Sequence, residues 1–156
     1  MAKSSAGILL YRQSGSELEV LLIHPGGPMW ARKDAGAWSI PKGGIEAGED
    51  PLTAARREFS EELGSPLPDD APEPLDLGEV RLRSGKRIRA FAVAGDMDVT
   101  RVVSNTTEME WPPRSGRRIT VPEVDRAAWF TVATAAVALN PAQVELVERL
   151  LGFLGG

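Results

Sequence analysis

The sequence of 156 residues predicts one α/β domain in which a mixed β-sheet lies between helices. The first observation is the order of the segments: strand-like runs, an amphipathic helix, further strand-like runs and a terminal amphipathic helix. That order is typical of a sheet covered by helices. The second observation is composition, since 42% hydrophobic and 26% charged residues are ordinary for a globular domain. At this length the simplest organisation is a single domain, residues 1–156, with one core.

Two strands begin the chain. Residues 6–11 (AGILLY) and 18–23 (LEVLLI) are short apolar runs, and residues 13–16 between them contain Ser-Gly. This pattern predicts a hairpin. Residues 24–37 are rich in Gly and Pro and predict a loop, after which residues 38–40 lead into Pro41-Lys42-Gly43-Gly44, a short strand entering the box loop.

A helix is predicted over residues 51–63. Asp50 is a favoured N-cap, Pro51 is a favoured first residue, and Gly64 is a favoured left-handed stop. The helical period of 3.6 residues separates two faces. The apolar face comprises Leu52, Ala55, Phe59 and Leu63, and the acidic face comprises Glu58, Glu61 and Glu62.

The acidic face costs helix stability. Glu58 and Glu62 repel each other at i,i+4, and all three glutamates lie toward the negative end of the helix dipole. Local costs of this kind tend to mark functional sites. Carboxylate oxygens suit Mg²⁺, Mn²⁺ or Ca²⁺ better than zinc. The alternative is a helix whose acidic face is simply solvated.

The second half of the chain is less regular. Residues 65–73 form a Pro-rich linker, and residues 75–83 and 87–94 predict a second hairpin. Residues 96–120 have no clear period and predict a long loop or a broken strand. Residues 121–130 end in a strand, residues 131–138 form a short helical turn, and residues 141–154 form an amphipathic helix.

Residues 43–65, the box segment, resemble the Nudix box, G-x5-E-x7-R-E-U-x-E-E-x-G-U, where U is a bulky apolar residue. Ser65 departs from the final apolar position. The resemblance implies a Nudix-like α/β/α sandwich with a mixed β-sheet. It also implies a hydrolase that uses Mg²⁺ or Mn²⁺ to cleave a phosphoanhydride in a nucleoside diphosphate-linked substrate. The matching positions are Gly43, Glu49, Arg57, Glu58, Phe59, Glu61, Glu62 and Gly64.

The same resemblance assigns roles to these residues. Glu61 and Glu62 are the primary metal ligands, and Glu58 is either a ligand or the base that takes a proton from water. The Lys42 carbonyl completes the metal shell. Arg57 takes part in the catalytic group as the partner of Glu49 in an ion pair that fixes the loop, and Gly43 and Gly64 support the box. A further carboxylate ligand is expected from a distant loop: Glu123 is the candidate, with Glu108 and Glu110 as rivals.

Substrate-binding residues are expected outside these acids. Lys42 lies in W-S-I-P-K-G-G, which resembles the branch that cleaves diadenosine polyphosphates and diphosphoinositol phosphates, so its ammonium is a candidate for the phosphates. Alternation on the second hairpin places four arginines on one sheet face, and two loop tryptophans are candidates for stacking on a base. His24 is expected to be structural. The arginines are Arg81, Arg83, Arg87 and Arg89, and the tryptophans are Trp30 and Trp111.

Composition limits the remaining classes. Without cysteine the chain has neither disulfides nor thiolate metal sites, and one histidine excludes a multi-histidine zinc site. A net charge of −4 argues against a general nucleic-acid binder. The first residues have neither a signal-peptide nor a membrane-span pattern, which favours a cytoplasmic protein. We expect a small nucleotide substrate and allow a homodimer. The alternative function is a non-catalytic nucleotide-binding regulatory Nudix domain.

Overall fold

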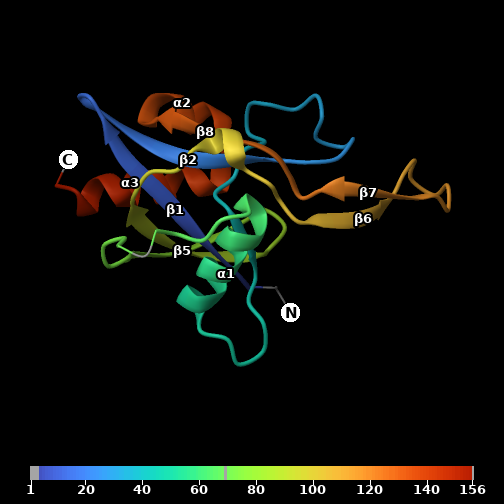
Figure 1. Ribbon diagram of the computed structural model, residues 1–156, viewed down its shortest axis with the longest axis horizontal. Helices are drawn as coiled ribbons and strands as arrows, with labels where there is room; N and C mark the ends of the chain where they lie inside the picture. The colour runs from blue at the N-terminus through green and yellow to red at the C-terminus, as the bar shows by residue number, and fades with distance from the viewer. Residues whose placement is uncertain (1–3, 69, 156) are drawn as a thin grey trace.

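The computed structural model describes residues 4–68 and 70–155. Its centre is a six-stranded sheet of order β4-β5-β1-β2-β8, with β3 pairing beside β2 on β1 (Figure 1). β1 and β5 are parallel and the other pairs are antiparallel, so the predicted mixed sheet is confirmed. The strands are β1 Ser4–Ser14, β2 Glu17–Pro25, β3 Lys42–Gly44, β4 Leu75–Arg81, β5 Arg87–Ala94 and β8 Val124–Thr131.

Both faces of this sheet are buried in a hydrophobic core. Successive side chains of a strand point to opposite faces, so each strand contributes to both cores. In β1, Ile8 and Leu10 join the core beneath α1 (Pro51–Leu63), whereas Leu9 joins the core on the other face. That second core is covered by α2 (Val132–Ala138), the 3₁₀ turn η2 (Pro141–Gln143) and α3 (Val144–Phe153). The predicted α/β/α sandwich is therefore confirmed, with α1 on one face and α2 and α3 on the other (Figure 1).

α1 begins and ends where the sequence predicts. The Asp50 carboxylate accepts hydrogen bonds from the backbone N–H groups of Leu52 (3.1 Å) and Thr53 (3.2 Å). Gly64 has φ 76° and its N–H donates to the Ser60 carbonyl. Phe59 and Leu63 are fully buried. The packing of this apolar face on the sheet sets the rotation of the helix about its axis, and therefore the direction in which its acidic side chains point.

The region 96–120 is more ordered than a loop. It contains η1 (Val99–Arg101), β6 (Thr106–Glu110) and most of β7 (Arg118–Pro122), and β6 and β7 form a separate antiparallel hairpin. The hairpin projects from the body of the molecule (Figure 1). The long-loop alternative was therefore wrong. The exposed residues of β6 are mostly polar, so the strand lacks the apolar alternation that sequence analysis looks for.

The short strand that enters the box loop is β3, within the predicted residues 41–44. One smaller boundary differs from prediction. β4 ends at Arg81, so Arg83 lies in the turn and only the other three arginines can share a strand face. Within the described residues no helix is long and apolar enough to cross a membrane.

Candidate active site

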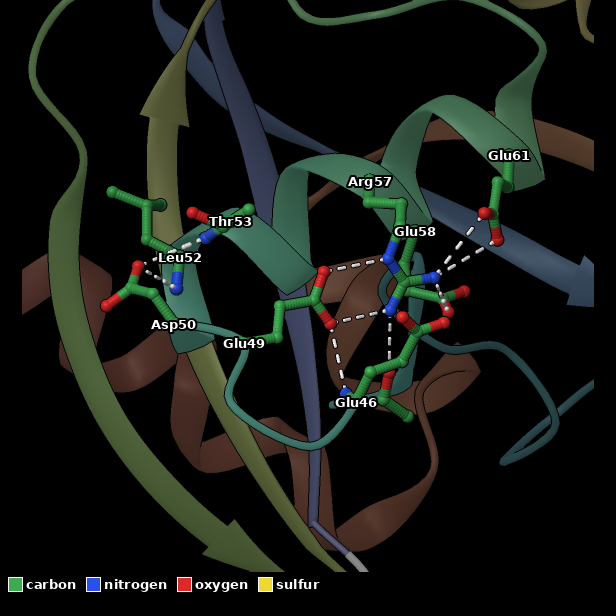
Figure 2. A network of polar contacts seen from close by, with 9 residues as sticks. Glu46, Glu49, Asp50, Leu52, Thr53, Arg57, Glu58 and Glu61 are labelled. Carbon is green, nitrogen blue, oxygen red and sulfur yellow. Dashed lines mark hydrogen bonds and ion pairs between the residues drawn. The ribbon is translucent and has the colours of Figure 1, made fainter.

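Arg57 organises the start of the box segment. Its guanidinium donates two hydrogen bonds of 2.9 Å to the Glu49 carboxylate and a third to the Gly44 carbonyl (2.9 Å). A bidentate arginine–carboxylate pair fixes both partners in one geometry. The hydrogen bonds from Arg57 lower the pKa of Glu49 to about 2. The loop between β3 and α1 is thus tied to the helix by one arginine (Figure 2).

The same arginine also reaches two of the helix acids. Its Nη1 donates to Glu58 (2.9 Å) and lies 3.4 Å from Glu61 (Figure 2). Glu58 is buried, whereas the Glu61 side chain is 41% exposed. Burial raises the pKa of Glu58, and Glu61 adds to this effect while Arg57 opposes it. Arg57 therefore orients Glu58 and partly offsets the repulsion among the helix acids.

Gly43 makes the position of Glu58 possible. A Cβ atom added to Gly43 would collide with the carboxyl group of Glu58. The helix acid and the backbone of β3 therefore lie against each other, and only glycine leaves room for the carboxylate. Steric contact with Glu58 therefore explains why the first residue of the box segment is glycine, without any need for unusual backbone angles.

Glu62 and Lys42 lie on the inner side of the helix. The Lys42 backbone N–H donates to Glu62 Oε1 at 3.2 Å. Burial raises the pKa of Glu62 to about 8, although the N–H and charge of Lys42 act in the opposite direction. Burial also lowers the pKa of the Lys42 ammonium, while Glu62 opposes that change. Burial thus disfavours the charged form of both side chains, which line the same pocket.

Glu123 joins this group from the other end of the chain. It connects β7 and β8, and it lines the same pocket as Lys42 and Glu62. Burial raises the pKa of Glu123, with a further contribution from Glu61. Its rivals lie elsewhere: Thr107 and Met109 line the pocket, so Glu108 between them faces away, and the Glu110 carboxylate accepts from the backbone of Arg114 and Gly116.

These carboxylates suit a divalent cation in their chemistry. Glu58, Glu62 and Glu123 each have a raised pKa because they are buried near one another, and a bound cation would offset that cost. They do not form a finished centre: among residues 4–68 and 70–155, no three His, Cys, Asp or Glu side chains are grouped closely enough to hold a metal ion. The Arg57 guanidinium donates a hydrogen bond to Glu58 and lies close to Glu61. The Lys42 backbone N–H donates a hydrogen bond to Glu62.

The pocket beside the acids has a volume of about 270 Å³. Its charged lining residues are Lys42, Glu62 and Glu123. The remaining lining is mainly apolar and comes from the end of β2, residues 26–40 and the β6–β7 hairpin. These residues are Ile23, Pro25, Met29, Trp30, Ile40, Met109, Val121 and Pro122.

We call residues 26–37 and the β6–β7 hairpin the pocket wall. His24, fully buried, anchors it: Nδ1 lies 2.9 Å from Asp125 Oδ1, and Nε2 lies 2.6 Å from the Lys33 carbonyl. The Gly26 N–H donates to the Glu123 carbonyl at 3.1 Å. The sequence predicted a structural His24 but not this connection, because Asp125 lies 101 residues away and has no sequence signal.

Several substrate-side candidates lie outside this pocket. Trp30 lines it, but Trp111 follows β6 at the turn of the hairpin and does not. Arg87 and Arg89 are on β5, which pairs with one edge of β1, whereas β3 and the pocket lie beyond the other edge. Arg89 is paired with Asp76. The structure therefore brings together Lys42, Glu58, Glu62 and Glu123, and none of the four arginines lines the pocket beside them.

Comparison with known proteins identifies one family. The family model of the NUDIX domain matches residues 1–150. An RNA pyrophosphohydrolase of Rhodospirillum rubrum is 30% identical over 171 residues, which cover 97% of this chain and 92% of that protein. Nudix hydrolase 25 of Arabidopsis thaliana is 66% identical over 29 residues, 19% of this chain and 17% of that protein.

Solved structures show the same fold at low identity. A Caenorhabditis elegans Ap4A hydrolase in a binary complex superposes with a TM-score of 0.65 at 21% identity, covering 99% of each chain. A MutT protein from Methanosarcina mazei superposes with a TM-score of 0.64 at 18% identity, covering 99% of this chain and 96% of that one.

Proposed function

This chain belongs to the NUDIX family and is a Nudix hydrolase, and from that premise we propose that it is a divalent-metal-dependent pyrophosphohydrolase. It cleaves a phosphoanhydride in a nucleoside diphosphate-linked substrate and uses Mg²⁺ or Mn²⁺. The observation that carries this proposal is the convergence of Glu62, Glu123 and Lys42 on one pocket, beside an Arg57–Glu49 frame that positions Glu58.

The reaction requires a nucleophile at an anionic phosphorus atom. Glu62, Glu61 and Glu123 would hold the cation, which would offset phosphate charge and favour ionisation of water. Glu58 would accept the proton of the attacking water, since burial raises its pKa toward the range of a useful general base. The water oxygen bonds to phosphorus and the bridging P–O bond breaks, so the second phosphate departs with the bridging oxygen.

Arg57 and Lys42 would act through position and charge. Arg57 keeps the Glu58 carboxylate in place and remains bound to Glu49 and Gly44, so it is a positioning residue. Lys42 places its side chain in the pocket beside Glu62, where an ammonium offsets the charge of a phosphate. Both roles need the loop between β3 and α1 to stay docked on the helix.

The substrate class follows from the relatives and the pocket together. The relatives named above include an RNA pyrophosphohydrolase and an Ap4A hydrolase, and both names describe a nucleotide joined to further phosphates. We propose a dinucleoside polyphosphate, a nucleoside triphosphate or a triphosphate end of RNA. The regulatory alternative lacks a supporting observation, since the box segment keeps every acid.

The test replaces Glu61 and Glu62 separately with Gln. We expect kcat to fall by roughly two orders of magnitude or more for a panel of dinucleoside polyphosphates, nucleoside triphosphates and nucleotide sugars, with thermal unfolding little changed. Glu148→Gln, an exposed acid on α3, is the matched control. Chelation should abolish turnover and added Mg²⁺ should restore it. Wild-type rates in both variants, or turnover without divalent ions, would contradict the proposal.

A further inference from the structure

We propose that Gly7 and Gln143 are positioning residues that set where Lys42 lies in the pocket. This inference rests on the proposed function, because that function assigns the Lys42 ammonium to the phosphates of the substrate. It goes further by naming two residues, from opposite ends of the chain and outside the box segment, that act on substrate binding through Lys42. Neither of the two lines the pocket itself.

Residues 39–42, which we call the entry segment, run between β1 and β2. Ser39 exchanges two backbone hydrogen bonds with Ile23 of β2, of 2.8 and 3.0 Å. On the other side, the Pro41 carbonyl accepts a hydrogen bond from the Ile8 N–H of β1 at 3.1 Å. The entry segment is therefore fixed to two strands just where the chain reaches the pocket.

Gly7 lets the entry segment lie closer to β1 than a side chain would allow. It is the direct partner of Lys42 in the antiparallel pairing of β1 with β3. A Cβ atom on Gly7 would lie 2.5 Å from the Pro41 carbonyl oxygen and 2.7 Å from the Lys42 Cβ. Directly opposite Cβ atoms are normally about 4.5–5.5 Å apart. Neither contacted atom can rotate away, because one belongs to the backbone and the other is bonded to it, so the entry segment itself would have to move.

Gln143 holds the same segment from the layer of α2 and α3. It is 1% exposed, and its Oε1 accepts a hydrogen bond from the Ile40 backbone N–H at 3.0 Å. Its Nε2 donates to Ser39 Oγ at 3.0 Å, and the Ser39 hydroxyl donates to the Ile40 carbonyl at 2.7 Å. The carboxamide thus takes the place of a strand as the partner of the Ile40 N–H, two residues before Lys42.

These two contacts fix the backbone from which the Lys42 side chain extends. The Lys42 N–H donates to Glu62 Oε1 at 3.2 Å, and both residues line the pocket. A lysine ammonium lies on a flexible four-carbon stem, so a fixed backbone limits the space that it samples and lowers the entropy cost of binding a phosphate. Displacement of the entry segment would therefore weaken phosphate binding, while the acids of α1 keep the place set by the packing of that helix. The expected kinetic result is a higher KM at nearly constant kcat.

The test measures binding of inorganic tripolyphosphate at saturating Mg²⁺ by titration calorimetry. Lys42→Ala should weaken binding by about tenfold or more, the effect of one lost hydrogen bond from a charged group. Gly7→Ala and Gln143→Met should each weaken it by about threefold to tenfold through displacement of Lys42. Gln143→Glu keeps an acceptor for the Ile40 N–H and should retain most of the affinity. Steady-state kinetics with the substrate panel should show KM rising by the same factors and kcat changing less than KM.

The Lys42→Ala background separates positioning from a general loss of structure. If Gly7 acts through Lys42, Gly7→Ala should weaken tripolyphosphate binding by less than about twofold once the ammonium is absent. Equal weakening in both backgrounds would overturn the inference, and so would wild-type affinity in both Gly7→Ala and Gln143→Met. Should Gly7→Ala fail to fold, Gln143→Met and its rescue by Gln143→Glu decide alone.

Two matched controls accompany these variants. A Cβ on Gly152 meets open space, and Gln13 is exposed on β1, so Gly152→Ala and Gln13→Met should bind tripolyphosphate as the wild type does. Absence of tripolyphosphate binding in the wild type would also overturn the inference. Since binding requires no turnover, binding that depends on Gly7 and Gln143 without hydrolysis of any substrate in the panel would contradict only the proposed function.

Discussion

The box segment and the pocket wall meet at one site but are built differently. The polar contacts of the box segment join residues that are close in sequence. Arg57 binds Glu49 eight residues away, and Glu62 accepts a hydrogen bond from the Lys42 N–H twenty residues away. The pocket wall depends on distant partners, since His24 and Asp125 are 101 residues apart. The proposed chemistry is therefore encoded by local spacing, whereas the pocket around it depends on the completed fold.

This difference has a functional consequence. A helix and its preceding loop can keep the same acids while the wall around them changes, because the two regions share no residues. Glu123 connects them, since it directly follows β7 of the wall and lines the pocket beside Glu62. Substitutions in the box segment should therefore affect kcat, and substitutions in the wall should affect KM.

The largest expected effect comes from Gly43→Ala. The added methyl group would displace the Glu58 carboxylate, so we expect kcat to fall by about 100-fold or more if Glu58 is the general base. The displaced group is the end of a side chain, so the free energy of unfolding should change little. Steady-state kinetics and urea unfolding check both parts.

Gly44→Ala is the matched control for that variant. A Cβ on Gly44 meets open space, and its carbonyl can still accept from Arg57. We expect kcat within about threefold of wild type. Equal losses in the two variants would mean that the loop tolerates no side chain at all, and the steric account of Gly43 would be wrong.

His24→Phe tests the wall and should have a smaller effect on catalysis. Phenylalanine fills the buried site but removes both polar contacts, leaving Asp125 and the Lys33 carbonyl without this partner. We expect a loss of about 1–3 kcal/mol in the free energy of unfolding. The loosened loop should raise KM severalfold with kcat little changed. A lower kcat at constant KM would show that the wall positions the catalytic acids, contrary to the division drawn above.

The sequence predicted what depends on local rules. Asp50 and Gly64 define α1 because capping residues act within one turn, and periodicity identified Phe59 and Leu63 as core. The resemblance to the Nudix box implied the Arg57–Glu49 ion pair, which the structure contains. The hairpin of β6 and β7 was missed, since its strands are short, exposed and mostly polar.

Contacts between distant segments had no comparable signal. Nothing in the sequence places Gly26 against Pro122 and Glu123, or Gly27 against Met109. Alternation did suggest a shared face for Arg81, Arg87 and Arg89, and the pairing of β4 with β5 agrees. It did not reveal on which side of β1 that face lies, because strand order is set by tertiary packing. The roles of the box acids and of the arginines stay predictions.

The smallest expected effect, that of Arg89→Ala, decides whether the arginine hairpin belongs to the site. Arg89 and Asp76 form an exposed pair in which the arginine holds the pKa of Asp76 below its usual range. Solvent screening limits such a pair to about 0.2–1 kcal/mol. Because the folded pKa of Asp76 is depressed, this stability is present above about pH 4 and is lost as the pH falls through the folded pKa. The difference in the free energy of unfolding between wild type and Arg89→Ala should therefore disappear in strong acid.

The effect of Arg89→Ala on activity should be small. We expect kcat/KM at neutral pH to stay within about twofold of wild type, because the pocket lies on the other side of β1. Urea unfolding across pH and the substrate panel measure both, and a large rise in KM would return the arginines to the polyphosphate site.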